Sequence, residues 1–167
     1  MNKIELNRPP FRRYFVFKNQ CFLVIATGLG IGYLPGAPGT YGTILAAFVY
    51  YFLLPDRYSL YLICLTISVV IGVISAGKAE QIFGVRDSSH IVIDEILGFW
   101  LAMCGLPKGW GYIILGIVLF RLFDILKPFP IKSLESLSGG IGIVTDDLMA
   151  GLYTLIILKL LIYIFGV

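Results

Sequence analysis

The sequence predicts an all-α protein, a polytopic helical bundle embedded in a membrane. Of its 167 residues, 58% are hydrophobic and only 14% are charged, whereas a soluble domain carries about a quarter charged residues. Long apolar stretches alternate with short polar turns, and the length fits a single integral membrane domain over residues 1–167. Because so few side chains are charged, the positions of these charges are informative.

The chain begins with a basic segment. Residues 1–20 carry lysine or arginine at five positions, and no acidic residue follows Glu5 in this stretch. The positive-inside rule places such a segment in the cytoplasm. Most of the net charge of +3 lies here, so it does not indicate nucleic-acid binding.

The next stretch, "CFLVIATGLGIGYLPGAPGTYGT", is rich in glycine and contains two prolines. It cannot form one straight helix, so a short apolar segment followed by an irregular Gly-rich loop or re-entrant segment is expected. Backbone N–H groups of such a loop can cradle a phosphate, and Thr40 and Thr43 would add hydroxyl donors. The loop is not a P-loop, because no Gly-Lys-Ser/Thr sequence ends it.

Five apolar helices are expected after this point. The last has twenty residues, enough at 1.5 Å per residue to cross a hydrocarbon core of about 30 Å, and the others are shorter. Alternation from a cytoplasmic N-terminus leaves only Arg57 and Lys108 in the outer loops, in agreement with the charge bias. Lys159, inside the last helix, is expected to extend outward to the interface. The expected helices are 43–54, 58–77, 91–106, 110–126 and 147–166.

Acidic side chains converge at the cytoplasmic ends of these helices. Ionisable groups at membrane depth are costly, so a function is the default hypothesis. Oxygen ligands without histidine or cysteine favour Mg²⁺, Mn²⁺ or Ca²⁺ over zinc. Carboxylates solvated at the interface, or stabilised by a helix N-terminus, are the alternative. The predicted catalytic and metal-binding residues are Asp94, Glu95, Asp124, Asp146 and Asp147.

Small residues follow two of these acids on the same helical face. Such residues let helices approach closely, although ordinary helix packing produces the same pattern. Gly98 and Ala102 follow Asp94, and Ala150, Gly151 and Thr154 follow Asp147.

Basic residues lie close to the acids in the segment "RLFDILKPFPI". Arg121 is one helical turn from Asp124 and can grip a phosphate with its planar fork, and Lys127 supplies a second cation. Arg86 is a further candidate for phosphate binding. The alternative for Arg121 and Asp124 is a plain interfacial salt bridge. His90, the only histidine, is more often structural in such a position than a general base.

Four segments together resemble the phosphatidylglycerophosphatase A family. They are "GLGIGYLPGAPGTYGT", "RDSSHIVIDEILGFW", "RLFDILKPFPI" and "GGIGIVTDDLMAG", in the family's order over residues 28–151. The resemblance implies a Mg²⁺-dependent phosphatase of the bacterial inner membrane, with its active site facing the cytoplasm. Its substrate would be a phospholipid, phosphatidylglycerophosphate, converted to phosphatidylglycerol in phospholipid biosynthesis. The chain departs from the family at Arg86-Asp87, where Lys-Asp is common.

A small cation transporter or channel with a carboxylate-lined path is the alternative function. A transporter places its acids near the bilayer midplane, whereas these acids cluster at one face. Histidine-nucleophile lipid phosphatases fit less well, because their scheme needs at least two histidines. The sequence does not indicate an oligomeric state.

Overall fold

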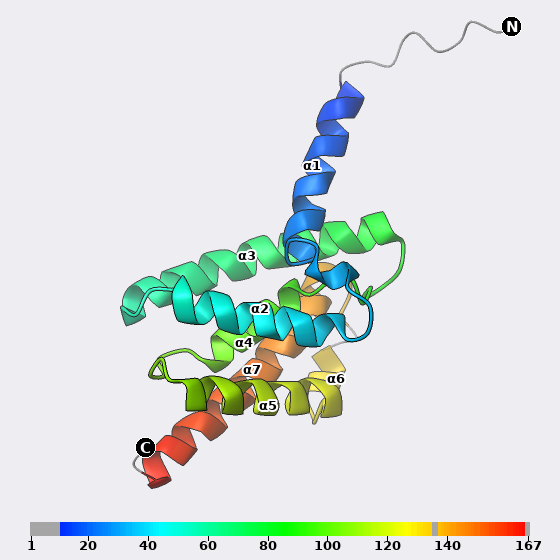
Figure 1. The fold of residues 1–167 in the computed structure, drawn as a ribbon. Helices are drawn as coiled ribbons and strands as arrows, with labels where there is room; N and C mark the ends of the chain where they lie inside the picture. Colours follow the sequence, from blue (N-terminus) through cyan, green and yellow to red (C-terminus); the bar gives the residue numbers. More distant parts are fainter. Residues whose placement is uncertain (1–10, 135–136, 166–167) are drawn as a thin grey trace, which may run out of the picture.

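The structure, a computed structural model, describes residues 11–134 and 137–165, which form seven α-helices and one 3₁₀ helix without a strand. The all-helical prediction is therefore confirmed. Figure 1 shows the order of the helices along the chain. They are α1 (Phe11–Ala26), η1 (Ile31–Tyr33), α2 (Pro38–Phe52), α3 (Tyr58–Phe83), α4 (Ile93–Ala102), α5 (Trp110–Leu126), α6 (Ile131–Leu134) and α7 (Gly139–Phe165).

The short helix α4 and the long helix α7 lie at the centre of the molecule. α4 packs against α2, α3, α5 and α7, and α7 also packs against α3 and α5. The helices α2, α3 and α5 run roughly alongside one another, whereas α1 runs across them (Figure 1). Leu97, Phe99 and Phe120 are fully buried between these layers.

Among the described residues, two helices are long and apolar enough to cross a membrane. α3 and α7 have 26 and 27 residues, which correspond to about 39 and 40 Å of helix. The other three expected spans are shorter, with 15 residues in α2, 10 in α4 and 17 in α5. Large apolar side chains point outward, and so large an apolar surface indicates membrane association. Among them are Ile44 and Phe48 on α2, Ile63, Ile67 and Val70 on α3, and Ile114 and Val118 on α5.

The expected helix bounds are accurate for α5 and shifted elsewhere. α5 covers 110–126 and ends before Pro128 as expected, because proline restricts the residue before it. α2 begins at Pro38 rather than residue 43, since proline suits the first helical turn. α3 continues to Phe83, and α1 and α6 were not expected as helices.

The largest difference is the start of α7. The sequence predicts a glycine-rich turn and a helix from about residue 147, but the helix begins at Gly139. A Cβ on Gly140 would lie 1.9 Å from the carbonyl oxygen of Val73 in α3. Glycine here allows close helix packing, which outweighs its low helix propensity. As a result, Asp146 and Asp147 lie inside the helix, and stabilisation by its N-terminus no longer accounts for them.

Candidate active site

The site begins at the crossing of α4 and α7. A Cβ on Gly151 would lie 2.1 Å from the carbonyl oxygen of Gly98, and a Cβ on Gly98 would lie 2.6 Å from that of Asp147. The two backbones therefore touch, which confirms the close approach predicted from the small residues. Asp94 and Asp147 each precede a crossing glycine by one turn, so the crossing brings their side chains together.

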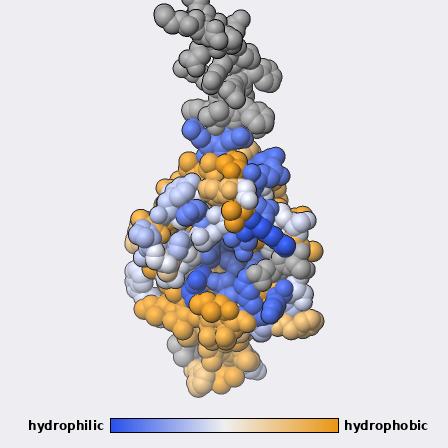
Figure 2. Space-filling model, turned by 90° about the vertical axis from the view of Figure 1, so that its right-hand side faces the viewer, coloured by the Kyte–Doolittle hydropathy of each residue, from blue (hydrophilic) through white to orange (hydrophobic). Residues whose placement is uncertain are grey.

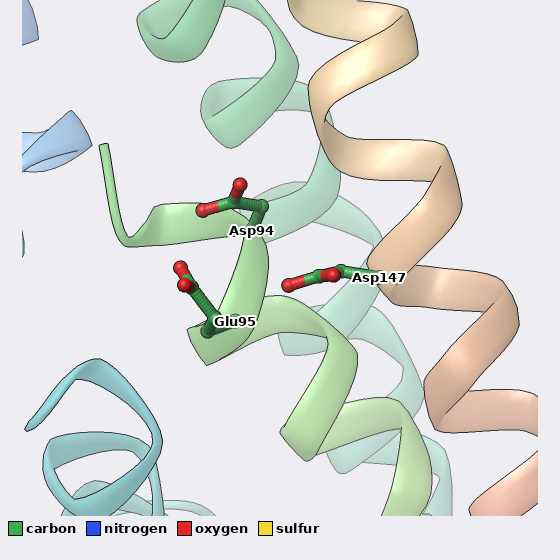
Figure 3. Close-up of side chains that lie close together, drawn as sticks. All are labelled: Asp94, Glu95 and Asp147. Atoms are coloured by element: carbon green, nitrogen blue, oxygen red, sulfur yellow. The ribbon is translucent and has the colours of Figure 1, made fainter. Parts of the chain in front are cut away.

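Three carboxylates form a compact cluster at this crossing. Asp94 and Glu95 from the first turn of α4 and Asp147 from α7 each offer one oxygen, and these oxygens lie within 4.8 Å of one another (Figure 3). Asp94 is 8% exposed and Asp147 is 4% exposed. Burial and mutual repulsion both disfavour three ionised groups in this space. The cluster therefore needs a cation to remain charged.

The donor atoms fit a hard divalent cation. Oδ1 of Asp94 and Oε2 of Glu95 are buried and have no hydrogen-bond partner among the described residues. Buried polar atoms are normally hydrogen-bonded, so these two oxygens are candidate ligand atoms for a cation. An all-oxygen set of carboxylates suits Mg²⁺, Mn²⁺ or Ca²⁺. Asp94, Glu95 and Asp147 could therefore hold a metal ion.

Arg121 connects the last turns of α5 with this cluster. Its Nη1 donates a hydrogen bond of 2.6 Å to Oδ2 of Asp124 and lies 3.8 Å from Oε1 of Glu95. The carboxyl group of Asp124 also interacts electrostatically with Asp147. Nε of Arg121 is buried without a hydrogen-bond partner in the described part of the chain. The expected salt bridge is present, yet it leaves a buried guanidinium donor unused.

Asp146 is not a member of the three-carboxylate cluster and pairs with Lys127 instead. Its Oδ2 accepts a hydrogen bond of 2.9 Å from Nζ of Lys127, and its Oδ1 accepts one of 3.0 Å from the backbone N–H of Asp147. Of the five predicted metal ligands, the structure brings together Asp94, Glu95 and Asp147 and pairs the other two acids with cations. The pairing of Lys127 with an acid was not foreseen.

The first turn of α2 lies against the cluster. A Cβ on Gly39 would lie 2.1 Å from Oε1 of Glu95 and 2.9 Å from Nη1 of Arg121. Thr40 is half-buried on the same turn. Thr43 is fully buried, and its hydroxyl donates to the carbonyl of Gly39 at 2.9 Å. This hydroxyl is used within the helix, and the structure does not support the expected contact with phosphate.

A polar cavity of about 510 Å³ adjoins the site. Figure 2 looks onto this end of the molecule, where α3 ends and α7 begins, and shows hydrophilic residues around a hollow above a hydrophobic band. The exposed Arg86 lines the cavity, and its Nη2 donates to the carbonyl of Leu137 at 3.2 Å. Lys132, which was not among the predicted site residues, lines it from α6, and Asp146 also lines it. Lys132 follows the Pro-Phe-Pro segment. That segment is the sequence feature that indicates a turn of the chain back towards the site.

His90 has a structural environment. Its Nδ1 lies 3.0 Å from the carbonyl oxygen of Gly32, and its ring lies near those of Tyr33 and Phe83. A Cβ on Gly32 would lie 2.0 Å from the carbonyl oxygen of His90. The segment before α2 is therefore fastened to the segment before α4, which helps to place Gly39 beside Glu95.

Known proteins resemble this chain over most of its length. A family model described as Phosphatidylglycerophosphatase A matches residues 24–162. A Bacteroides thetaiotaomicron protein provisionally named a phosphatidylinositol-3-phosphatase is 36% identical over 162 residues, covering 89% of this chain and 99% of its own. Proteins named phosphatidylglycerophosphatase A are 35% identical in Escherichia coli, over 77% of this chain and 76% of theirs, and in Haemophilus influenzae, over 80% and 84%. No solved structure matches significantly. The cluster, its arginine and the glycine-rich start of α2 thus lie within the matched region, and the chain belongs to the phosphatidylglycerophosphatase A family.

Proposed function

We propose that this protein hydrolyses the terminal phosphomonoester of phosphatidylglycerophosphate, giving phosphatidylglycerol and phosphate, with Mg²⁺ as cofactor. The observation that carries the proposal is the buried cluster of Asp94, Glu95 and Asp147, two of whose oxygens lack a partner in the described chain, beside Arg121. Membership of the family and the names of the Escherichia coli and Haemophilus influenzae relatives support the reaction and the substrate.

The proposed location is the bacterial inner membrane, with the site at its cytoplasmic face. The outward apolar side chains and the two long apolar helices support a multi-pass arrangement in which α2, α4 and α5 complete the bundle. The distribution of lysine and arginine supports the orientation. The glycine-rich stretch over residues 27–37 would then lie at the cytoplasmic interface, where protein and water satisfy its backbone.

Each residue of the site has a distinct proposed role. Asp94, Glu95 and Asp147 would hold Mg²⁺, which when bound neutralises the phosphomonoester and lowers the pKa of a water molecule for in-line attack. Arg121 would bind the transferring phosphoryl group with the donors that Asp124 leaves unused. Asp124 positions Arg121 through their hydrogen bond of 2.6 Å.

The remaining predicted residues surround this centre. Asp146 fixes the ammonium group of Lys127 at the entrance, and Arg86 lines the adjoining cavity. Both cations would attract the phosphate of the headgroup. The first turn of α2, with Gly39 and Thr40, presents backbone N–H groups that have no partner within the helix and favour an anion.

A cation transporter is less compatible with this site. Asp94 and Glu95 lie in the first turn of α4 and Asp124 lies near the end of α5, whereas Asp147 lies inside α7 but closer to its start than to its end. Arg121 and Lys127 lie among them and would oppose passage of a cation. Purified protein in liposomes is expected to show no Mg²⁺ flux above that of empty liposomes.

Phosphate release from pure protein tests the proposal. Protein in detergent is given phosphatidylglycerophosphate with Mg²⁺, or with excess EDTA, and phosphatidylinositol 3-phosphate serves as a second substrate because of the Bacteroides relative. We expect release from phosphatidylglycerophosphate only with Mg²⁺, and release lowered by about a thousandfold in Asp147→Asn. Release only from the inositol lipid would reassign the substrate, and no release from folded protein would refute the reaction.

A further inference from the structure

A second cavity lies at the opposite end of the molecule from the carboxylates. It has a volume of about 720 Å³ and lies between the end of α2, the start of α3 and the segment that follows α4. The end of α2 and the start of α3 lie at the left in Figure 1, whereas the first turn of α4, which carries Asp94 and Glu95, lies further to the right. The proposed reaction does not use this cavity. Its lining includes Tyr58, Tyr61, Leu106, Lys108 and Lys159.

The cavity carries an excess of positive charge. Nζ of Lys108 lies 2.8 Å from Oδ1 of Asp56, and the same ammonium group also donates to the carbonyl of Leu54. No described carboxylate lies within ion-pair distance of Lys159, whose Nζ lies 3.9 Å from the position of a Cβ on Gly105. Two lysines and one aspartate leave one uncompensated positive charge. The side chain of Lys159 lines the cavity, near Gly105, and does not simply extend away from the helix.

An apolar groove borders this cavity. The groove has a volume of about 330 Å³ and lies between α5 and α7, where Tyr112, Leu115 and Leu161 line it. Residues adjacent along the chain line the two spaces: Lys108 lines the cavity and Gly109 the groove, and Lys159 lines the cavity and Leu158 the groove. A cationic cavity beside an apolar groove suits a molecule with an anionic head and an apolar tail.

We propose that the cavity and groove bind one anionic phospholipid of the surrounding bilayer. Its phosphodiester lies at Lys159 and Lys108, and one acyl chain lies in the groove between α5 and α7. A phosphodiester carries one negative charge, which matches the single excess positive charge, whereas a phosphomonoester carries nearly two. The cavity volume of about 720 Å³ is in the usual range for a small-molecule binding site. The proposal rests on membrane embedding and not on the phosphatase reaction.

The walls of the cavity are fixed by the protein itself. The hydroxyl of Tyr50 donates to the carbonyl of Leu106, and the hydroxyl of Tyr61 donates to the carbonyl of Trp100. These bonds tie α2 and α3 to α4 and to the segment after it. Two of the tyrosine hydroxyls are therefore already satisfied, and Lys159 remains as the group that selects the ligand by charge.

Native mass spectrometry of the purified protein in detergent tests this site. Phosphatidylglycerol is added at increasing concentration, with phosphatidylcholine as the zwitterionic control, to wild type, Lys159→Gln and Lys159→Arg. We expect about tenfold weaker retention of phosphatidylglycerol by Lys159→Gln, as for loss of one charge-assisted bond, and retention by Lys159→Arg close to wild type. Wild type should retain phosphatidylglycerol in preference to phosphatidylcholine.

Two further arms separate the possible sources of the ligand. Inorganic phosphate and the deacylated headgroup, glycerophosphoglycerol, are added as competitors, and neither should displace the lipid at concentrations where phosphatidylglycerol saturates. Displacement by either would overturn the lipid assignment in favour of a free-anion site, and equal retention by wild type and Lys159→Gln would overturn the site itself. Asp147→Asn is expected to retain the lipid although it strongly lowers turnover, so failure here is distinguishable from failure of the reaction.

Discussion

The two ends of the molecule use the same helices in opposite ways. At one end, α4 and α7 touch at Gly98 and Gly151, and this contact brings the carboxylates of Asp94 and Asp147 close to each other. At the other end, Met103 just after α4 and Lys159 of α7 line a cavity of about 720 Å³. Close backbone packing therefore concentrates negative charge at the first end, whereas an open space leaves a positive charge accessible at the second.

The difference shows how costly charges are managed in an apolar fold. Buried carboxylates with unsatisfied oxygens are tolerated where a cation can offset their negative charge. At the other end, Lys108 is paired with Asp56, whose side chain is 84% exposed. At that end, water and this ion pair are enough to stabilise the charges of Lys108 and Asp56. The carboxylate end should therefore be far more sensitive to substitution than the lysine end.

Neutralising an acid should separate the two ends most strongly. Asp94→Asn and Asp147→Asn are each expected to lower phosphate release by about a thousandfold, because each removes charge from the site that is proposed to stabilise the transition state. Rates are measured in detergent at saturating Mg²⁺. The matched control is Asp56→Asn, for which less than about a twofold change is expected, as for an exposed ion pair. A loss of activity in Asp56→Asn as large as in Asp94→Asn and Asp147→Asn would contradict the expected difference in sensitivity between the two ends.

A methyl group added beside the cluster should have the next largest effect. Gly39→Ala places a Cβ only 2.1 Å from Oε1 of Glu95 and 2.9 Å from Nη1 of Arg121, so both side chains must move. Displacement of catalytic groups by about 1 Å can cost about a hundredfold in rate, and we expect a loss of that size with little change in thermal unfolding. Gly111→Ala is the control, because a Cβ there meets no atom within 4 Å. Full activity in Gly39→Ala would show that the start of α2 does not shape the site.

The shape of the cation at the site provides the third test. Arg121→Lys keeps the charge but loses the planar fork, which binds Asp124 and is proposed to bind a phosphate oxygen as well. We expect about a tenfold lower kcat, measured with KM on the same substrate. An unchanged kcat with a raised KM would instead place Arg121 in substrate binding alone.

The sequence allowed the convergence of the acids to be predicted, but not all of their partners. Topology and small-residue spacing were enough to bring Asp94 next to Asp147. The long-range pairing of Asp146 with Lys127 depends on side-chain conformations that residue spacing does not determine. The start of α7 was missed because glycine is common in turns and at close helix contacts alike, and only the neighbouring Val73 distinguishes these cases. Lys159 was placed outward because the cavity beside it is built from segments distant in sequence.

The two threonines of α2 give the smallest and most local test. Thr43→Val removes a hydroxyl that donates to the carbonyl of Gly39 within the helix, so we expect a loss of about 1 kcal/mol in stability and less than about a twofold change in activity. Thr40→Val changes the half-buried turn beside Gly39 and should lower kcat/KM more than Thr43→Val does. Both are measured by thermal unfolding and phosphate release. A greater loss of activity in Thr43→Val than in Thr40→Val would mean that the Thr43 hydroxyl leaves its helical partner when substrate binds, as the sequence first suggested.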